Sequence, residues 1–162
     1  MPILFLIIGF VSTANAQVSK LQPFFIYNFI KQIEWPASSS TGDFVIGVVG
    51  QSEITGELIK LSKTKKVNER RIIVKNFSSV SDISNCQILF VPANHNSSLQ
   101  KAIEKLGGAS TLVITEAEGA ISQGSAINFV IRESRQRFQV SKENASKKGV
   151  KISSYLIKLA VQ

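Results

Sequence analysis

Apolar residues recur along the first half of the chain in two different patterns. Residues 19–33 carry aromatic and aliphatic side chains at every third or fourth position, which is typical of a helix. Ser19 can cap this helix, Pro23 suits its first turn, and Pro36 follows its end. Residues 43–49 are instead a nearly continuous apolar run, which favours a strand buried on both faces.

From this point strand-like and helical stretches alternate. Each predicted strand is short and apolar, and each predicted helix begins near a serine and repeats its apolar residues at helical spacing. Such alternation indicates crossover connections and a parallel sheet. We expect further strands at 71–74, 87–91 and 111–115, helices from Ser52 to Leu61 and from Ser97 or Ser98 to Leu106, and a helical turn at 81–83.

The pattern changes after Gly119. Two strand-like runs, 127–132 and 137–140, are separated by four polar residues, and this spacing predicts an antiparallel hairpin. Two short helices are expected after it, at 141–148 and 153–161. The pattern therefore predicts an α/β fold, a three-layer sandwich with a mainly parallel sheet, an antiparallel hairpin on its C-terminal side and helices on both faces.

The N-terminal segment is typical of a cleaved signal peptide. An apolar run fills the first ten residues, and a small-x-small motif ends at Ala16, which predicts cleavage between Ala16 and Gln17. The segment lacks the usual basic residue near its start. A buried helix or strand is the alternative, and a membrane span would need roughly 20 apolar residues. We therefore expect residues 1–16 to be removed and 17–162 to form one exported, periplasmic α/β domain.

The composition leaves little for catalysis. The 162 residues are 44% hydrophobic and 19% charged, so an ordinary core is available without metal or disulfide staples. Cys86 is the only cysteine, which excludes a disulfide within the chain. His95 is the only histidine, which excludes a metal centre built on several histidines.

Cys86 and His95 are also poorly placed to act together. A cysteine nucleophile needs a base and a lowered pKa, and only His95 could serve as that base. The two residues flank the predicted strand 87–91 and would lie roughly 25–30 Å apart. We interpret Cys86 as a structural free thiol and His95 as an exposed loop residue.

The carboxyl ends of parallel strands are where such folds bind ligands. The loops expected there are 50–52, 92–95 and 115–119, and none of them carries a nucleotide-binding glycine motif. Glu116 and Glu118 could form the carboxylate pair of a hydrolase, but two acidic residues in a loop are common. We therefore predict no catalytic, metal-binding or cofactor-binding residue, no cofactor and no enzyme activity, and we expect the function to be binding.

Basic residues are concentrated in two segments of the chain. The formal net charge is +8, from 19 lysines and arginines against 11 acidic residues. Residues 60–75 hold seven basic residues and one acidic residue, and residues 130–162 hold eight and two. Solvated helix or turn surfaces would account for either segment. Since stacking aromatics are missing from 60–75, and export is expected, we predict no nucleic-acid partner.

The predicted N-terminal helix is unusually aromatic. Five of the chain's thirteen aromatic residues lie between positions 24 and 35, on more than one helical face. One face can pack on the sheet while another meets a partner, although all five could also belong to the core. The candidate partner or dimer interface comprises Phe24, Tyr27, Trp35, Lys65, Lys66, Arg70 and Arg71.

Six stretches, in this order, resemble one family over nearly all of the expected mature chain. The first is the aromatic stretch that ends in Glu34-Trp35-Pro36. The sequence is similar to the YfiR family of exported proteins, also called YfiR/HmsC-like. The matching stretches are 29–36, 44–50, 85–92, 111–116, 124–130 and 149–160.

The resemblance implies a regulatory role. YfiR-like proteins are periplasmic, commonly dimeric α/β domains, and the best understood of them holds the periplasmic sensor domain of an inner-membrane diguanylate cyclase inactive. An outer-membrane lipoprotein can sequester such an inhibitor, and relatives are associated with histidine kinases. Family members often contain disulfides. Cys86 matches a family cysteine but has no mate within the chain, so redox control would require pairing between subunits.

Three classes of function therefore remain open at this point. The first is a periplasmic inhibitor that controls cyclic-di-GMP or biofilm-type output by protein contact. The second is a module that binds a small molecule at the strand ends. The third is an envelope polysaccharide binder that uses the basic segments.

Overall fold

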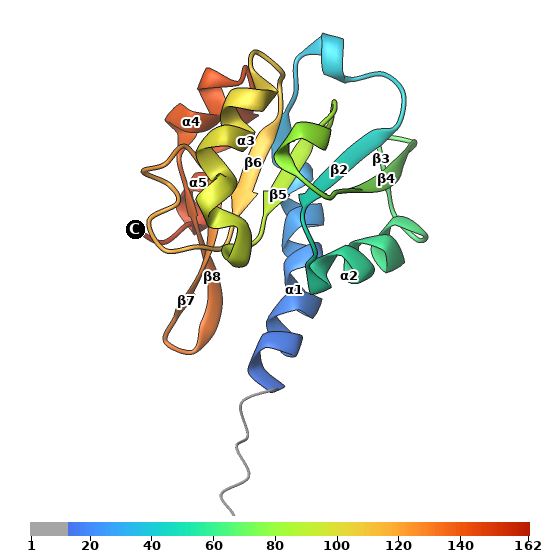
Figure 1. Ribbon diagram of the computed structural model, residues 1–162. Helices are drawn as coiled ribbons and strands as arrows, with labels where there is room; N and C mark the ends of the chain where they lie inside the picture. Colours follow the sequence, from blue (N-terminus) through green and yellow to red (C-terminus); the bar gives the residue numbers. More distant parts are fainter. Residues whose placement is uncertain (1–12) are drawn as a thin grey trace, which may run out of the picture.

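The computed structural model describes residues 13–162 (Figure 1). Its five helices are α1 (Thr13–Ile30), α2 (Glu53–Ser62), α3 (Leu99–Leu106), α4 (Lys142–Lys147) and α5 (Ser154–Leu159). Its strands are β1 (Ile33–Glu34), β2 (Phe44–Val49), β3 (Lys66–Val67), β4 (Arg70–Phe77), β5 (Ile88–Val91), β6 (Leu112–Thr115), β7 (Ile127–Arg132), β8 (Arg135–Val140) and β9 (Lys151–Ile152). Three 3₁₀ turns are η1 (Ala37–Ser39), η2 (Val80–Asp82) and η3 (Ala93–Ser98).

Seven strands form one sheet in the order β3-β4-β2-β5-β6-β7-β8. The five central strands are parallel, and the two edge strands, β3 and β8, are antiparallel to their neighbours. A separate antiparallel pair joins β1 to β9. The predicted fold class is confirmed, with the expected hairpin forming one edge of the sheet.

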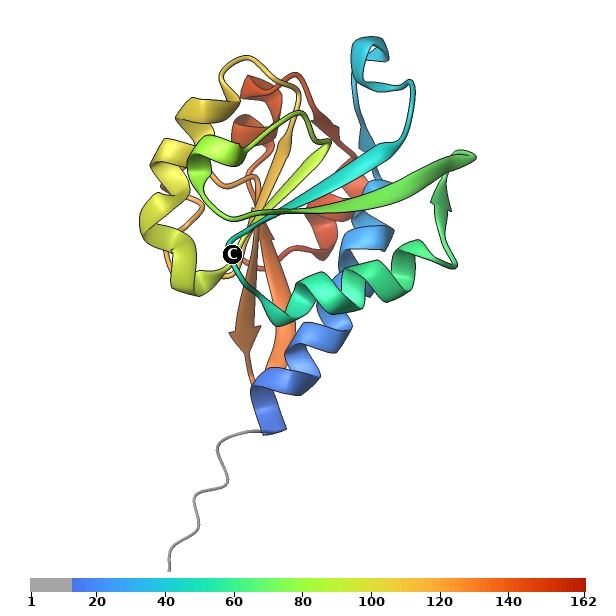
Figure 2. The ribbon, with the colours of Figure 1, turned by 45° about the vertical axis from the view of Figure 1, so that its right-hand side comes forward.

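The sheet is buried on both faces by helices. In β5, Ile88 and Phe90 belong to a core shared with α1, α2 and α5, whereas Leu89 and Val91 belong to a core shared with α3. Figure 2 shows α3 on the opposite side of the sheet from α1 and α2. The continuous apolar strands of the sequence therefore serve two cores at once, as expected for a covered parallel sheet.

Aromatic packing joins α1 to the β7–β8 hairpin. The ring of Phe29 lies 4.7 Å from that of Phe138 and 5.7 Å from that of Phe129, between centroids. Phe25 contacts the same two rings at 6.2 and 6.0 Å. These contacts lie in the C-terminal half of α1 and fix the helix beside the hairpin. Both elements extend past the body of the sheet (Figure 1).

The boundaries predicted for the first helix are wrong at both ends. The helix begins at Thr13, continues through position 19 and contains Pro23 in its interior. It ends at Ile30, because the chain then forms β1, which pairs with the distant β9. The helix also runs without a break through positions 16 and 17.

Residues 1–12, most of the expected signal peptide, lie outside the described part of the chain. Among residues 13–162, no helix has the length and apolar character needed to cross a bilayer.

The hairpin turn is tighter than the sequence indicated. β8 begins at Arg135, opposite Arg132, so the turn contains only Glu133 and Ser134. Both turn residues have left-handed backbones, with φ of 51° and 58°. Such two-residue turns match the twist of the strands but usually use asparagine or glycine, which is why the polar spacing suggested a longer loop.

Candidate functional site

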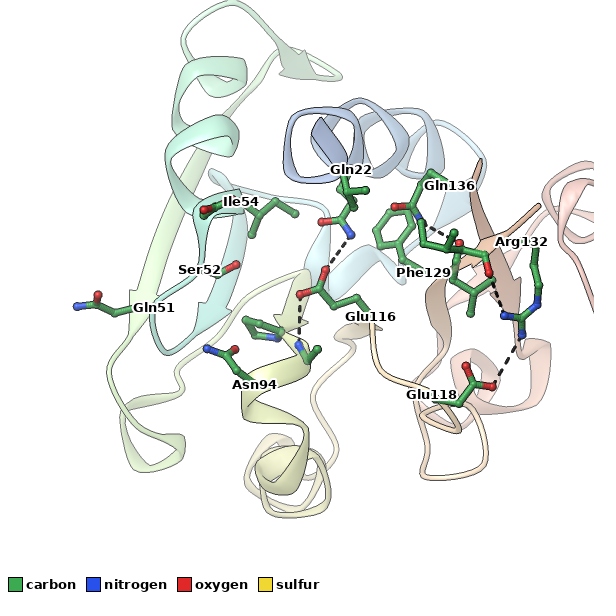
Figure 3. Close-up of a pocket in the computed structure, with 16 residues that line it drawn as sticks. Gln22, Gln51, Ser52, Ile54, Asn94, Glu116, Glu118, Phe129, Arg132 and Gln136 are labelled. Carbon is green, nitrogen blue, oxygen red and sulfur yellow. Dashed lines mark hydrogen bonds and ion pairs between the residues drawn. The ribbon is translucent and has the colours of Figure 1, made fainter. Parts of the chain in front are cut away.

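Three loops meet where β2, β5 and β6 end, as the parallel topology predicted. Together with α1 and the β7–β8 hairpin, they line a cavity of about 690 Å³, which we call the strand-end cavity (Figure 3). The loop residues are Gln51 to Glu53, Pro92 to Asn94, and Glu116 with Glu118. Val18 and Gln22 line the cavity from α1, and Phe129 to Arg132 and Gln136 line it from the hairpin.

Glu116 lies at the centre of this cavity (Figure 3). Its Oε2 accepts a hydrogen bond from Gln22 Nε2 at 2.8 Å, and its Oε1 accepts one from the Ala93 backbone N–H at 3.2 Å. Gln22, on α1, is only 2% exposed, so the residues packed around it hold its amide in place. Glu116 therefore links α1 to the loop after β5.

A buried polar cluster fixes the strand from which Glu116 emerges. Thr115 Oγ1 lies 2.7 Å from Asn128 Oδ1 and 2.8 Å from Ser125 Oγ, and all three residues are buried. Ser125 also donates to the carbonyl of Ile127 at 2.7 Å. Because buried polar groups must be paired, this cluster sets the end of β6 against β7 and orients the following residue.

His95 is packed against the first of the three loops. Gly50 has a left-handed backbone with φ of 67°, and a Cβ at this position would collide with the His95 imidazole. His95 is half-buried in η3, so the expectation of an exposed loop residue is wrong. The imidazole covers Gly50 and thereby holds the loops after β2 and β5 together.

Charged groups at the cavity are mainly acidic. Glu118 lies 3.8 Å from Arg132, and Glu53 stands in the first turn of α2. Glu116 and Glu118, considered as a carboxylate pair from the sequence, thus bind different partners. Within residues 13–162, no three His, Cys, Asp or Glu side chains converge closely enough to hold a metal ion.

Exposed apolar side chains continue from the cavity onto the surface. Phe24 is 58% exposed and Leu21 46% exposed on the outer face of α1, and Ile131 is 50% exposed on β7. Val18 is half-buried, lines the cavity as Ile131 does, and precedes Leu21 by about one helical turn. We call these four residues the apolar ridge.

Of the ridge, the sequence singled out only Phe24. Leu21 lies three positions before it on the same helical face, which is a signal that was available. Ile131 was not recognisable, because the apolar pattern of β7 looked like uniform core.

Tyr27, Lys65 and Lys66 come together at another site, between α1 and β3. The Tyr27 hydroxyl donates to the carbonyl of Lys66 at 3.2 Å. The ammonium groups of Lys31 and Lys65 lie 4.5 and 5.8 Å from the centre of the tyrosine ring. These contacts form a basic surface around a half-buried aromatic ring.

Trp35, Arg70 and Arg71 lie around β2 and make contacts within the fold. The Trp35 ring packs on Phe44 at 5.2 Å, and its Nε1 donates to the carbonyl of Gln87 at 3.1 Å. Arg71 pairs with Asp43 at 3.0 Å. Arg70 donates to the backbone carbonyls of residues 41, 42 and 43.

The two basic segments lie at opposite edges of the sheet. Residues 60–75 form the end of α2, β3 and most of β4, whereas residues 130–162 include β8 at the other edge. Six strand spacings separate these edges, roughly 29 Å. The basic residues on β3 are therefore well separated from those on β8.

Cys86 is buried in the core next to α3, and its thiol is free. Burial raises the pKa of this thiol to about 11, although a hydrogen bond with the Thr111 side chain acts in the opposite direction. Cys86 and His95 lie at opposite ends of β5, as predicted. The thiol is thus neutral and shielded near neutral pH.

Comparison with known proteins gives one informative result. A search of curated proteins found no match. The family model described as YfiR/HmsC-like, however, matches residues 19–161, which is most of the chain. Except for Val18, this range contains every residue that lines the strand-end cavity and every residue of the apolar ridge. The chain therefore belongs to the YfiR/HmsC-like family of periplasmic regulators of cyclic-di-GMP signalling.

Proposed function

We propose that this protein is exported as residues 17–162 and inhibits an inner-membrane signalling enzyme by binding that enzyme's periplasmic sensor domain. The observation that carries the proposal is the apolar ridge, which places Leu21, Phe24 and Ile131 in solvent on two elements that extend past the sheet. Large apolar side chains exposed on two neighbouring elements support a protein-binding surface.

Phe24 is the proposed anchor of this contact. Aromatic side chains dominate the binding energy of protein interfaces when they enter a pocket on the partner. The ridge is also bordered by the exposed polar residues Gln17, Lys20 and Asn28, which suits the polar rim of an interface. The rigid aromatic packing beneath α1 means that little order must be gained on binding.

Inhibition requires a preference for one conformation of the partner. A binder holds a sensor inactive only if it binds the inactive state more tightly than the active one. We propose a diguanylate cyclase as the partner, with a histidine kinase as the alternative, and biofilm-type output as the consequence.

A second exposed apolar pair, Tyr155 and Leu159 on α5, is the proposed contact between two copies of the chain. These residues are one turn apart and therefore share one side of the helix. An outer-membrane lipoprotein that relieves inhibition would compete for one of the two surfaces. Sedimentation velocity tests the dimer, which Leu159→Glu should dissociate and Lys101→Glu on α3 should leave intact.

The inhibitor proposal is tested with the purified chain and the periplasmic domain of the membrane sensor encoded beside it. Phe24→Asp should weaken binding by about 30-fold or more, as expected for a lost aromatic anchor. Lys101→Asp, at an exposed position of α3, is the control and should leave affinity unchanged. In cells, the wild-type chain should lower cyclic-di-GMP and Phe24→Asp should not.

Equal binding by wild type and Phe24→Asp would contradict the role of the ridge. Absence of binding by the folded wild-type chain, together with unchanged cyclic-di-GMP and unchanged kinase output, would contradict the inhibitor proposal itself.

A further inference from the structure

We propose that the strand-end cavity binds a small organic cation, with Glu116 as the counter-ion. The inference concerns the isolated chain and does not depend on the partner proposed above.

The position of the cavity is the first argument. β2 leads into α2 on one face of the sheet, and β5 leads through η3 into α3 on the other face. The loops after these neighbouring strands therefore diverge, and a crevice opens between them. Crevices at such switch points are the usual ligand sites of open α/β sheets, and the volume of about 690 Å³ suits a small molecule.

The charge of the lining decides which ligands fit. Arg132, the one cation among the residues that line the cavity, pairs with Glu118 at 3.8 Å, which leaves the carboxylate of Glu116 at the centre of the cavity. The N-terminus of α2 also lies at the cavity and contributes about half a positive charge. The sum remains negative, although the whole chain carries +8. An anion would thus meet net repulsion here, and a cation would meet attraction.

The chemistry of the walls favours an organic cation over a metal ion. No metal-binding cluster exists among residues 13–162, since the carboxylates are spread across the cavity. The cavity is also lined by the large apolar side chains of Ile54, Phe129 and Ile131. A ligand that carries an ammonium group on an apolar body could pair with the Glu116 carboxylate and pack on these apolar side chains.

The carboxylate of Glu116 is already held in a fixed orientation before such a ligand binds. Gln22 and the Ala93 N–H each bind one carboxylate oxygen, which fixes the plane of the carboxylate without adding a positive charge. Each oxygen keeps a further lone pair that can accept from a ligand ammonium. Gln51, Ser52 and Asn94, on the adjacent loops, supply polar groups for orientation.

The experiment titrates the purified chain with three related probes: benzylammonium, benzyl alcohol and benzoate. Calorimetry should show saturable binding of benzylammonium, at least about tenfold weaker binding of the neutral alcohol, and no binding of benzoate, because a charge-assisted hydrogen bond contributes about a factor of ten or more. Nuclear magnetic resonance should show benzylammonium shifting the Ala93 amide and the Gln22 side-chain amide.

Three variants locate the site. Glu116→Gln keeps the shape of the side chain and should weaken benzylammonium binding about tenfold or more. Glu104→Gln, on the exposed side of α3, is the matched control and should bind like wild type. Arg132→Gln removes the competing cation and should tighten binding. Thermal melting confirms that each variant is folded.

Any of three results would overturn the proposal. These are no benzylammonium binding by wild type up to about 10 mM, benzoate binding as tightly as benzylammonium, or unchanged binding by folded Glu116→Gln. Because the assay contains no partner protein, its failure would leave the inhibitor proposal standing, and the reverse also holds.

Discussion

The two helical layers of this molecule differ in the side chains that they expose to solvent. On one side of the sheet, α3 buries Leu99, Ala102 and Leu106 and turns polar residues outward. On the other side, the helices α1, α2 and α5 expose large apolar side chains, and β7 adds one more beside α1. The six large apolar side chains exposed among residues 13–162 are Leu21, Phe24, Ile59, Ile131, Tyr155 and Leu159.

The difference separates what folding requires from what binding requires. Folding needs one apolar stripe on each helix, and α3 shows that a helix can cover this sheet while its outer face stays polar. The outward apolar residues of α1 and α5 add nothing to the core, so a covering partner explains them better than folding does. The layer opposite α3 is therefore the side where we expect contacts with other proteins.

The largest expected effect is a difference in the free energy of unfolding between alanine variants of two phenylalanines on the same helix. Phe29 is 2% exposed and Phe24 is 58% exposed. Phe29→Ala should lower the free energy of unfolding by about 3–5 kcal/mol, because it leaves a cavity among packed rings. Phe24→Ala should change it by no more than about 0.5 kcal/mol. Urea unfolding measures both values, and a Phe24→Ala loss approaching that of Phe29→Ala would break the comparison.

The next effect tests whether water is excluded from the core next to α3. The pKa of the Cys86 thiol is about 11 in the folded chain and 9.0 in the unfolded reference. The unfolded chain therefore loses this proton first, and stability should fall as the pH rises from 9 to 11. The expected loss is about 2–3 kcal/mol, as an order of magnitude.

Cys86→Ala isolates this contribution, because lysine and tyrosine titration is common to both proteins. The difference in unfolding free energy between wild type and Cys86→Ala should change across this pH range and be flat below it. A difference that stays constant up to pH 11 would mean that the core next to α3 is open to water.

The smallest effect concerns the exposed surface alone. Leu21→Gln combined with Leu159→Gln should change the free energy of unfolding by no more than about 0.5 kcal/mol for each substitution. The double variant should nevertheless elute earlier from a hydrophobic-interaction column than wild type. Lys101→Gln on α3 is the control and should elute no earlier. An unchanged elution of the double variant would show that these side chains are covered in solution.

Much of the fold was predictable because local pattern and tertiary role agree. The runs that became β2, β5 and β6 are apolar at nearly every position, which only a doubly covered strand tolerates. The strands β1, β3 and β9 were missed, since each has two residues and exists only through its partner. Helix α1 was misplaced for a related reason, because β1 pairing and packing on the hairpin set its length.

The candidate site was predictable in part. Parallel topology was sufficient to bring the loops after β2, β5 and β6 together. The contact between Glu116 and Gln22 was not foreseeable, because the rotation of α1 about its axis depends on how Phe25 and Phe29 pack on the hairpin. The pairing of Glu118 with Arg132 at 3.8 Å was not foreseeable either, because it joins the loop after β6 to the end of β7.

The last residues of the chain have a protective role. The Val161 N–H donates to the carbonyl of Phe138 at 2.9 Å, on the outer side of β8. This contact covers part of an edge strand that would otherwise offer free backbone groups to another chain. Deleting residues 161 and 162, or fusing a bulky tag directly after them, would uncover that edge. Preparations altered in this way should precipitate more readily than the intact protein, and a label is better placed in the exposed loop at Gly107 and Gly108.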